Sequence, residues 1–206
     1  MQRQVVAVVG YSGSGMSTVT EVLKDMGFHA GSGGQVLRDL SDVLHRLKER
    51  YSLIELADAL RAQFGPAILM QGVAQKLERQ GGEKFVFDSI RNPWEVAFLK
   101  ERYRALVIGV NTPDNIRLKI MKKRGKEGDP TNMDELYALN VVDGNIGQPW
   151  WGQNIPGLMG MADVVITNNF YMPEPEVAKN FMKPLVEDAL VSKGCHEGQI
   201  PSPERR

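Results

Sequence analysis

Short runs of β-branched and aromatic residues alternate along the chain with longer segments in which apolar residues recur every three or four positions. The short runs are typical of strands buried on both faces, and the longer segments of helices with one apolar side. Strands are predicted at 5–10, 84–88, 105–110 and 163–168, and helices at 17–26, 93–103, 116–124 and 174–191. This alternation predicts a three-layer α/β fold with a mainly parallel sheet.

The segment 35–80 has helical spacing throughout, and we predict two or three helices in it, with a break at Gly65 and Pro66. One apolar stripe is expected from Leu37, Leu40, Val43, Leu44 and Leu47. There is no internal repeat and no linker that would divide the chain. We therefore expect a single domain over residues 1–193, followed by a flexible tail over 194–206.

Composition narrows the classes of function. Lys and Arg total 25, as do Asp and Glu, so the formal net charge is zero. This balance argues against non-specific nucleic-acid binding by the whole surface but leaves a local basic groove open. The single cysteine, Cys195, cannot form an internal disulfide, which favours a reducing compartment. No apolar run approaches the ~20 residues that span a bilayer, and the first residues do not resemble a signal peptide. We expect a cytoplasmic protein that does not contact membranes.

The most specific motif is GYSGSGMST, from Gly10 to Thr18, between a predicted strand and a predicted helix. It fits the phosphate-binding pattern G-x-x-x-x-G-K-[ST] at every position but one. Its glycines allow backbone amides to curl around a phosphate, and the helix that follows presents its positive end to the same anion. The alternative is a glycine-rich turn before an ordinary helix. The predicted phosphate ligands are Ser12, Gly13, Ser14, Gly15, Met16, Ser17 and Thr18, and Ser17 is also a predicted Mg²⁺ ligand.

Met16 stands where the pattern has lysine. A lysine here offsets phosphate charge in the transition state, and the loss of one such electrostatic contact commonly lowers the rate by about 10²–10³. Three explanations remain open. Another cation substitutes, the protein binds nucleotide without catalysis, or a natural lysine has been replaced.

Two further candidates follow the second predicted strand. Asp88 ends that strand, where parallel strands present their carboxyl ends to ligands. Its carboxylate would hold the water shell of Mg²⁺ or accept a proton from an attacking hydroxyl, and the alternative is a helix N-cap or a polar strand end. Arg91 is a candidate phosphate ligand, and the alternative is a surface ion pair.

Basic residues gather in the run KIMKKRGKEGDP at 119–130. Such a run forms either a solvated helix end or a lid that closes over ATP. In the second case the cations available to replace the missing lysine are Lys122, Lys123, Arg124 and Lys126.

Two adjacent tryptophans, Trp150 and Trp151, lie between a proline and a glycine. They suit a loop that stacks on a nucleobase or another flat group. The alternative is one ring packed on the core and the other half-exposed.

The chain resembles the P-loop nucleotide kinases of the adenylate kinase and dephospho-CoA kinase group. The likeness is to the archaeal-type branch, which also occurs fused to deoxycytidylate deaminase-like domains. The segments that carry the likeness are VVAVVGYSGSGMST, GQVLRDL, LADALRAQFGPAILMQGVAQKL, FVFDSIRNPWEVAFLKERY, RGKEGDP and GQNIPGLMGMADVVITNN. Their order and spacing agree over roughly residues 4–170. The chain departs from the family at Met16, at Gln35, where an acidic residue is usual, and at Leu139 and Asn140, where charged residues are common.

The resemblance implies a P-loop NTPase fold with a five-stranded parallel core, acceptor-binding helices at about 35–80 and a lid at about 117–145. It implies ATP and Mg²⁺ at Gly10–Thr18. It places Arg38, Asp88 and Arg91 in the acceptor site, and Arg117, Arg124 and Asp129 in or near the lid. With these assignments, Asp88, Arg91 and Arg124 become the catalytic candidates. Arg117 and Lys122 join the nucleotide ligands, Ser17 and Asp88 hold the metal, and Arg38, Arg91, Trp150 and Trp151 bind the substrate.

Three functions follow from these residues. The first is ATP-dependent phosphoryl transfer to a hydroxyl or phosphate of a nucleotide or nucleotide-like acceptor, by a monomer or homodimer. The second is phosphorylation of a hydroxymethyl-pyrimidine base, including one in phage DNA, with Trp150 and Trp151 stacking on the base. The third is a nucleotide-binding regulator without catalysis, in which Met16 records the lost chemistry.

Overall fold

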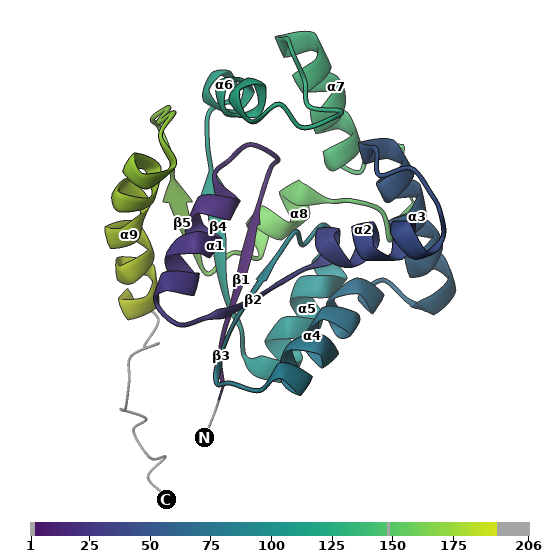
Figure 1. Ribbon diagram of the computed structural model, residues 1–206, viewed down its shortest axis with the longest axis horizontal. Helices are drawn as coiled ribbons and strands as arrows, with labels where there is room; N and C mark the ends of the chain where they lie inside the picture. The colour runs from purple at the N-terminus through teal and green to yellow at the C-terminus, as the bar shows by residue number, and fades with distance from the viewer. Residues whose placement is uncertain (1–2, 148, 193–206) are drawn as a thin grey trace, which may run out of the picture.

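The computed structural model describes residues 3–147 and 149–192, and within them a parallel sheet lies between two layers of helices (Figure 1). The strands are β1 (Gln4–Gly10), β2 (His29–Ser32), β3 (Lys84–Asp88), β4 (Leu106–Asn111) and β5 (Val164–Thr167). Their order across the sheet is β2-β3-β1-β4-β5, and every pair is parallel. The predicted α/β fold with a parallel five-stranded sheet is therefore confirmed.

Helices connect the strands and cover both faces of the sheet (Figure 1). They are α1 (Met16–Asp25), α2 (Gly33–Val43), α3 (Arg50–Phe64), α4 (Ile68–Gln80), α5 (Pro93–Tyr103), α6 (Asp114–Arg124), α7 (Met133–Asp143), α8 (Ile155–Gly160) and α9 (Pro175–Ser192). Helices α1 and α9 pack on one face, and α4, α5 and α8 on the other. Figure 1 shows α6 and α7 above the loop that joins β1 to α1, with α2 and α3 beside it.

The first strand shows why its sequence is apolar at successive positions. Val5, Ala7 and Val9 point into the core under α4, α5 and α8. Val6 and Val8 point into the core under α1 and α9. Because side chains of a strand alternate between faces, a strand covered on both sides needs apolar residues throughout. This packing holds the segment that follows Gly10 at the carboxyl edge of the sheet.

The predicted apolar stripe at 37–47 is only half correct. Leu37 and Leu40 pack on the core, but α2 ends at Val43, and the side chains of Val43, Leu44 and Leu47 are exposed. Arg46 N–H donates to Ser41 O, with His45 in the left-handed conformation, and this turn closes the helix. The apolar residues Leu44 and Leu47, which follow the helix, therefore do not pack on the core.

Three elements were not predicted from the residue pattern. Strand β2 is a short edge strand whose four residues are exposed or half-exposed. Helices α7 and α8 lie between 125 and 162, where the residue pattern predicted no helix. The predicted tail at 194–206 lies outside the described residues. None of the helices within 3–147 and 149–192 is both long and apolar enough to cross a membrane.

Candidate functional site

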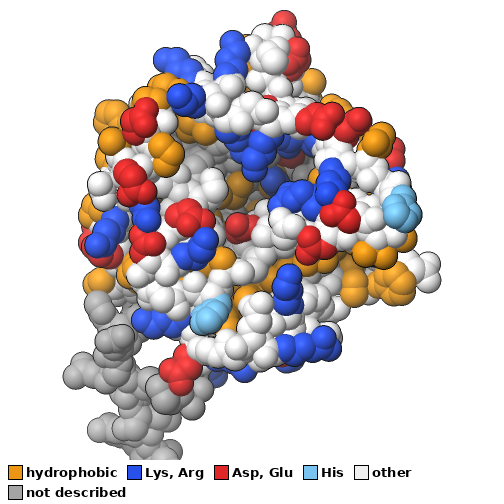
Figure 2. Space-filling view, viewed as in Figure 1, with side chains coloured by type: hydrophobic (Ala, Val, Ile, Leu, Met, Phe, Trp, Pro, Cys, Tyr) orange, Lys and Arg blue, Asp and Glu red, His pale blue; other side chains and the backbone are white. Residues whose placement is uncertain are grey.

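A cavity of about 710 Å³ opens at the carboxyl edge of the sheet. Figure 2 shows this face hollowed at its centre, with Lys and Arg side chains gathered along the rim. The predicted site residues that line the cavity are Ser12, Gly13, Gly15, Met16, Ser17, Thr18, Arg38, Asp88, Arg91 and Arg124. The structure thus brings the glycine-rich loop and the predicted acceptor residues to one cavity, although they are far apart in sequence.

The segment Gly10–Thr18, here called the P-loop, has the features of an anion site. Helix α1 begins directly after Gly15, which offers no side-chain cap, and its first turn contains no acidic residue. No carboxylate of its own first turn therefore offsets the positive end of the helix. The Ser14 N–H is already used, because it donates to Tyr11 O at 3.1 Å. Ser14 itself does not line the cavity, so its predicted role as a phosphate ligand is the weakest in the loop.

Side chains beneath the P-loop hold its carbonyl groups. Arg117 is buried, and its Nε donates to Ser12 O at 2.9 Å while Nη1 pairs with Asp114 at 2.7 Å. Its guanidinium also lies over the ring of Tyr11, 4.7 Å from the centroid. Burial lowers the pKa of Arg117, and the charge of Asp114 opposes this. Arg117 does not line the cavity, so it supports the loop from below and is not placed to bind a nucleotide directly.

Gly13 allows the P-loop to pack closely on α6. Its φ of 82° lies in the left-handed region, and a Cβ there would come within 2.7 Å of Met121 Cγ and 3.0 Å of Arg117 O. We expect Gly13→Ala to lower the free energy of unfolding by about 1–3 kcal/mol, because both the strain and the clash must be accommodated. Urea unfolding measures this. Gly72→Ala on α4 is the matched control, since its Cβ would meet no atom within 4 Å. It should be neutral or stabilising, and equal losses in both variants would contradict the packing argument.

Met16 lines the cavity but carries no charge. Its half-buried side chain packs against the apolar cluster under α1 and α9. The residue therefore packs as an apolar side chain does, and any positive charge near the P-loop must come from another segment.

Asp88 ends β3 beside Ser32 of the neighbouring strand. Its Oδ1 is buried and has no hydrogen-bond partner among the described residues. The next residue, Ser89, has a φ of 57°, a left-handed conformation that is uncommon for a residue other than glycine, and its Oγ accepts from Ser32 Oγ at 3.1 Å. A half-exposed carboxylate beside a strained turn, facing a cavity, is available to a cation or to a proton.

Arg91 is held in place by a buried ion pair that the sequence did not reveal. Glu95 Oε2 accepts from the backbone N–H of Arg91 at 2.8 Å and of Asn92 at 3.2 Å. Glu95 Oε1 accepts from Arg61 Nη2 at 3.1 Å, and the side chains of Arg61 and Glu95 are 1% and 0% exposed. Asn92 also caps α5 through Trp94 N–H. These contacts hold the backbone of Arg91, and its side chain lines the cavity.

The loop between α6 and α7, residues 125–132, is here called the lid loop. Arg124 pairs with Asp129 through two hydrogen bonds of 2.6 and 2.7 Å. Arg50, the first residue of α3, donates from Nη2 to Asp129 Oδ1 at 2.9 Å and from Nε to Gly128 O at 3.2 Å. Burial raises the pKa of Asp129, but hydrogen bonding and charge from Arg124, together with Arg50, outweigh it and hold the pKa below its usual range. The lid loop is thus tied to α3 through ionised groups.

Arg38 and Lys122 have different positions. Arg38 lines the cavity from α2, and its guanidinium donates to Gln35 Oε1 at 3.0 and 3.3 Å. Gln35 in turn donates to Asp39 at 2.6 Å. Lys122 is exposed on α6 and does not line the cavity. Of these two predicted ligands, the cavity includes only Arg38.

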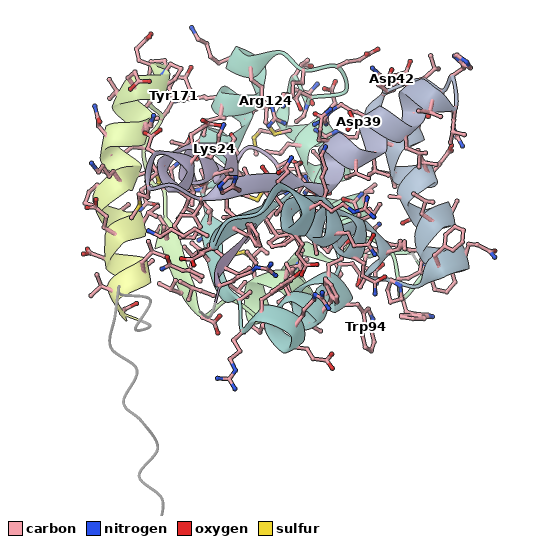
Figure 3. All side chains as sticks on the ribbon, turned by 60° about the horizontal axis from the view of Figure 1, so that its bottom comes forward. Lys24, Asp39, Asp42, Trp94, Arg124 and Tyr171 are labelled. Carbon is pink, nitrogen blue, oxygen red and sulfur yellow. The ribbon has the colours of Figure 1, made fainter. Side chains whose placement is uncertain are left out.

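The two tryptophans lie outside the cavity. Trp150 is 60% exposed and makes edge-to-face contacts with Trp151 at 5.4 Å and with Trp94 at 5.8 Å between ring centroids. Figure 3 shows Trp94 at the edge of the molecule, well separated from Arg124, which lines the cavity. The rings pack on one another outside the cavity, and the role of Trp150 and Trp151 in substrate binding stays a prediction.

Two buried polar atoms of cavity-lining residues mark what the site would hold. Asp88 Oδ1 and Arg91 Nη1 have no hydrogen-bond partner among the described residues. Within the same residues, no group of three His, Cys, Asp or Glu side chains is placed to hold a metal alone. A carboxylate oxygen and a guanidinium facing one cavity fit a magnesium nucleotide, in which phosphate oxygens complete the metal's ligands.

No family model matches the chain. A UPF0200 protein of Thermococcus kodakarensis is 26% identical over 196 residues, which cover 92% of this chain and 99% of that relative. A UPF0200 protein of Hyperthermus butylicus is 23% identical over 174 residues, which cover 84% and 90%. These names state no activity.

Solved structures show the fold. Protein TT1252 from Thermus thermophilus aligns with a TM-score of 0.55 at 17% identity, over 91% of this chain and 98% of that one. Shikimate kinase from Acinetobacter baumannii, solved with shikimate, aligns with a TM-score of 0.51 at 13% identity, over 91% and 95%. The chain therefore has the three-layer fold of P-loop kinases. At these identities the likeness extends to the fold alone, and the narrower adenylate kinase and dephospho-CoA kinase group is not established.

Proposed function

We propose that the protein is a P-loop kinase that transfers a phosphoryl group from ATP to a hydroxyl or phosphate of a nucleotide or nucleotide-like acceptor. One observation carries this proposal. The P-loop and a set of arginines from α2, α3, the β3–α5 turn and the end of α6 line a single cavity of about 710 Å³, together with the carboxylate of Asp88, whose Oδ1 has no hydrogen-bond partner among the described residues. That volume lies within the usual range of small-molecule sites.

Each side of the cavity suits one substrate. The amides at the start of α1 would bind the donor phosphates, and Arg38 and Arg91 would orient the acceptor on the opposite side. Transfer then forms a bond from the acceptor oxygen to the terminal phosphorus and breaks the bond to the bridging oxygen, which leaves ADP. For a hydroxyl acceptor, Asp88 would take the proton. Positioning and charge neutralisation would supply most of the rate gain.

Mg²⁺ would be held by Ser17 and Asp88 together with donor phosphates, and it would offset the negative charge of those phosphates. Ser17 is exposed in the first turn of α1 and lines the same cavity as Asp88. Both are oxygen ligands, which is the donor type that magnesium prefers.

The nucleotide class of acceptor rests on the resemblance of the sequence, and the solved kinases with this fold include one that was crystallised with shikimate. Phosphorylation of a base in DNA has weaker support, because the paired tryptophans lie outside the cavity. A regulator without catalysis is the remaining alternative, since Met16 carries no charge.

A transfer screen tests the proposal. The purified chain is incubated with ATP and Mg²⁺ and, in separate reactions, with nucleoside monophosphates, with shikimate, and with DNA bearing hydroxymethyl-pyrimidines. We expect ADP release that depends on a small acceptor. Transfer only to DNA would establish the modified-base function. Binding of ATP without transfer to any acceptor would favour the regulator.

A further inference from the structure

Two guanidinium groups from outside the P-loop meet at one of its side chains. Arg50 Nη1 lies 3.3 Å from Ser12 Oγ, and Arg91 Nη2 lies 3.5 Å from the same atom. Arg50 comes from the start of α3 and Arg91 from the turn before α5. Two like charges therefore converge on a neutral hydroxyl at the point where the P-loop faces the acceptor side.

Two carboxylates near these arginines also pair with other cations, Asp129 with Arg124 and Glu95 with Arg61. Asp129 is the carboxylate bonded to Arg50, and it is shared with Arg124. Arg91 Nη1 is buried and has no hydrogen-bond partner among the described residues. Burial lowers the pKa of Arg91, the charge of Asp143 opposes this, and the charge of Arg50 lowers it further. An anion at this point would satisfy the free donor and reduce the repulsion between the arginines.

The position of Ser12 indicates which anion would bind. The P-loop amides at the start of α1 are at one end of the loop, and Ser12 is nearer its other end, where it contacts Arg91. Transfer requires the terminal phosphate of the donor to face the acceptor. That phosphate is therefore the group expected beside Ser12. This is also the phosphate that a P-loop lysine would contact, and Met16 cannot.

We propose that Arg50, together with Arg91, supplies from α3 the positive charge that the P-loop lacks at Met16, by binding the terminal phosphate of the donor nucleotide. This inference rests on the proposed function. It differs from the expectation that a lid cation fills this role. Lys122 and Lys123 lie outside the cavity, and Arg124 lines it but is engaged by Asp129 through two bonds. Lys126 also lines the cavity, but among the described residues the cations bonded to Ser12 Oγ are Arg50 and Arg91. Because Arg50 also binds Gly128 and Asp129, the lid loop positions this charge.

The experiment compares affinity for ATP with affinity for ADP, both with Mg²⁺, by calorimetry on the full chain. Arg50→Gln removes the charge but keeps donors that can reach Gly128 O, so it is expected to fold, and thermal unfolding without nucleotide checks this. We expect it to weaken ATP binding about tenfold or more and ADP binding by less than about threefold, because a charge-assisted contact to the third phosphate is lost. Arg46→Gln is the matched control. Arg46 does not line the cavity, and its ion pair with Glu55 is exposed.

A variant with a lysine in the P-loop makes the test specific. In Met16→Lys the charge is restored within the P-loop, so the further change Arg50→Gln should cost less than about threefold in ATP affinity. Equal losses of ATP and ADP affinity, no loss, or the same loss in the Met16→Lys background would overturn the assignment of Arg50. If the unmodified chain binds neither nucleotide, the proposed function itself fails, and that result is distinct from a failure of Arg50 alone.

Discussion

Asp88→Asn should lower the rate of phosphoryl transfer about 10²-fold or more while leaving the protein folded. The amide cannot accept a proton at neutral pH and binds Mg²⁺ more weakly than a carboxylate does. The buried Oδ1 has no hydrogen-bond partner among the described residues, so little structure depends on its charge. The measurement is the initial rate of ADP release with the acceptor found in the screen, together with urea unfolding of the variant.

Glu101→Gln is the control for loss of a carboxylate, because Glu101 is exposed on α5 and does not line the cavity. It should match the parent in rate and in stability. An Asp88→Asn variant as active as the parent would remove Asp88 from the mechanism. A variant that has lost both activity and folding would show that the carboxylate is structural.

Glu95→Gln should destabilise the fold by about 3 kcal/mol, near the lower end of the range for breaking a buried ion pair. The side chains of Arg61 and Glu95 are almost wholly buried, and Arg61 would lose its closest buried counter-charge. Asp58, which also pairs with Arg61 and is 21% exposed, would still compensate in part. In a chain of this size the expected fall in Tm is about 6–12 °C.

A second substitution separates charge from shape in this pair. Arg61→Met combined with Glu95→Gln removes the uncompensated charge, while the amide oxygen can still accept from Arg91 N–H and Asn92 N–H. The double variant should recover most of the stability lost in Glu95→Gln. Glu55→Gln, which breaks an ion pair whose Glu55 side chain is 73% exposed, should cost at most about 1 kcal/mol. A double variant no more stable than Glu95→Gln would contradict the charge argument.

The best-predicted part of the fold is the part where several local signals agree. Helix α5 spans the predicted residues, since Pro93 stands at its first position and Asn92 caps it. The P-loop was predicted because a buried strand precedes its glycines and a helix follows them. Strand β2 was missed because four small or polar residues at a sheet edge give no apolar pattern.

The residues that line the cavity were predicted where a motif names them, and were not predicted where contacts are made across the fold. Arg50 follows a charged run that has no local signature, and its role depends on Ser12 and on Asp129, which is 79 residues away in sequence. That the tryptophans lie outside the cavity was not predicted, for a similar reason. Adjacent aromatic rings are expected both in a base-stacking loop and in a surface cluster, and only the contact of Trp150 with Trp94 distinguishes the two.

The central claim is that the backbone between β1 and α1 binds the phosphates of a nucleotide although Met16 stands in the lysine position. Calorimetry of the unmodified chain with ADP and with ATP, magnesium present, tests it most directly. We predict saturable binding of one nucleotide per chain, tighter for ATP than for ADP. The absence of both heat and thermal stabilisation with either nucleotide would contradict the account.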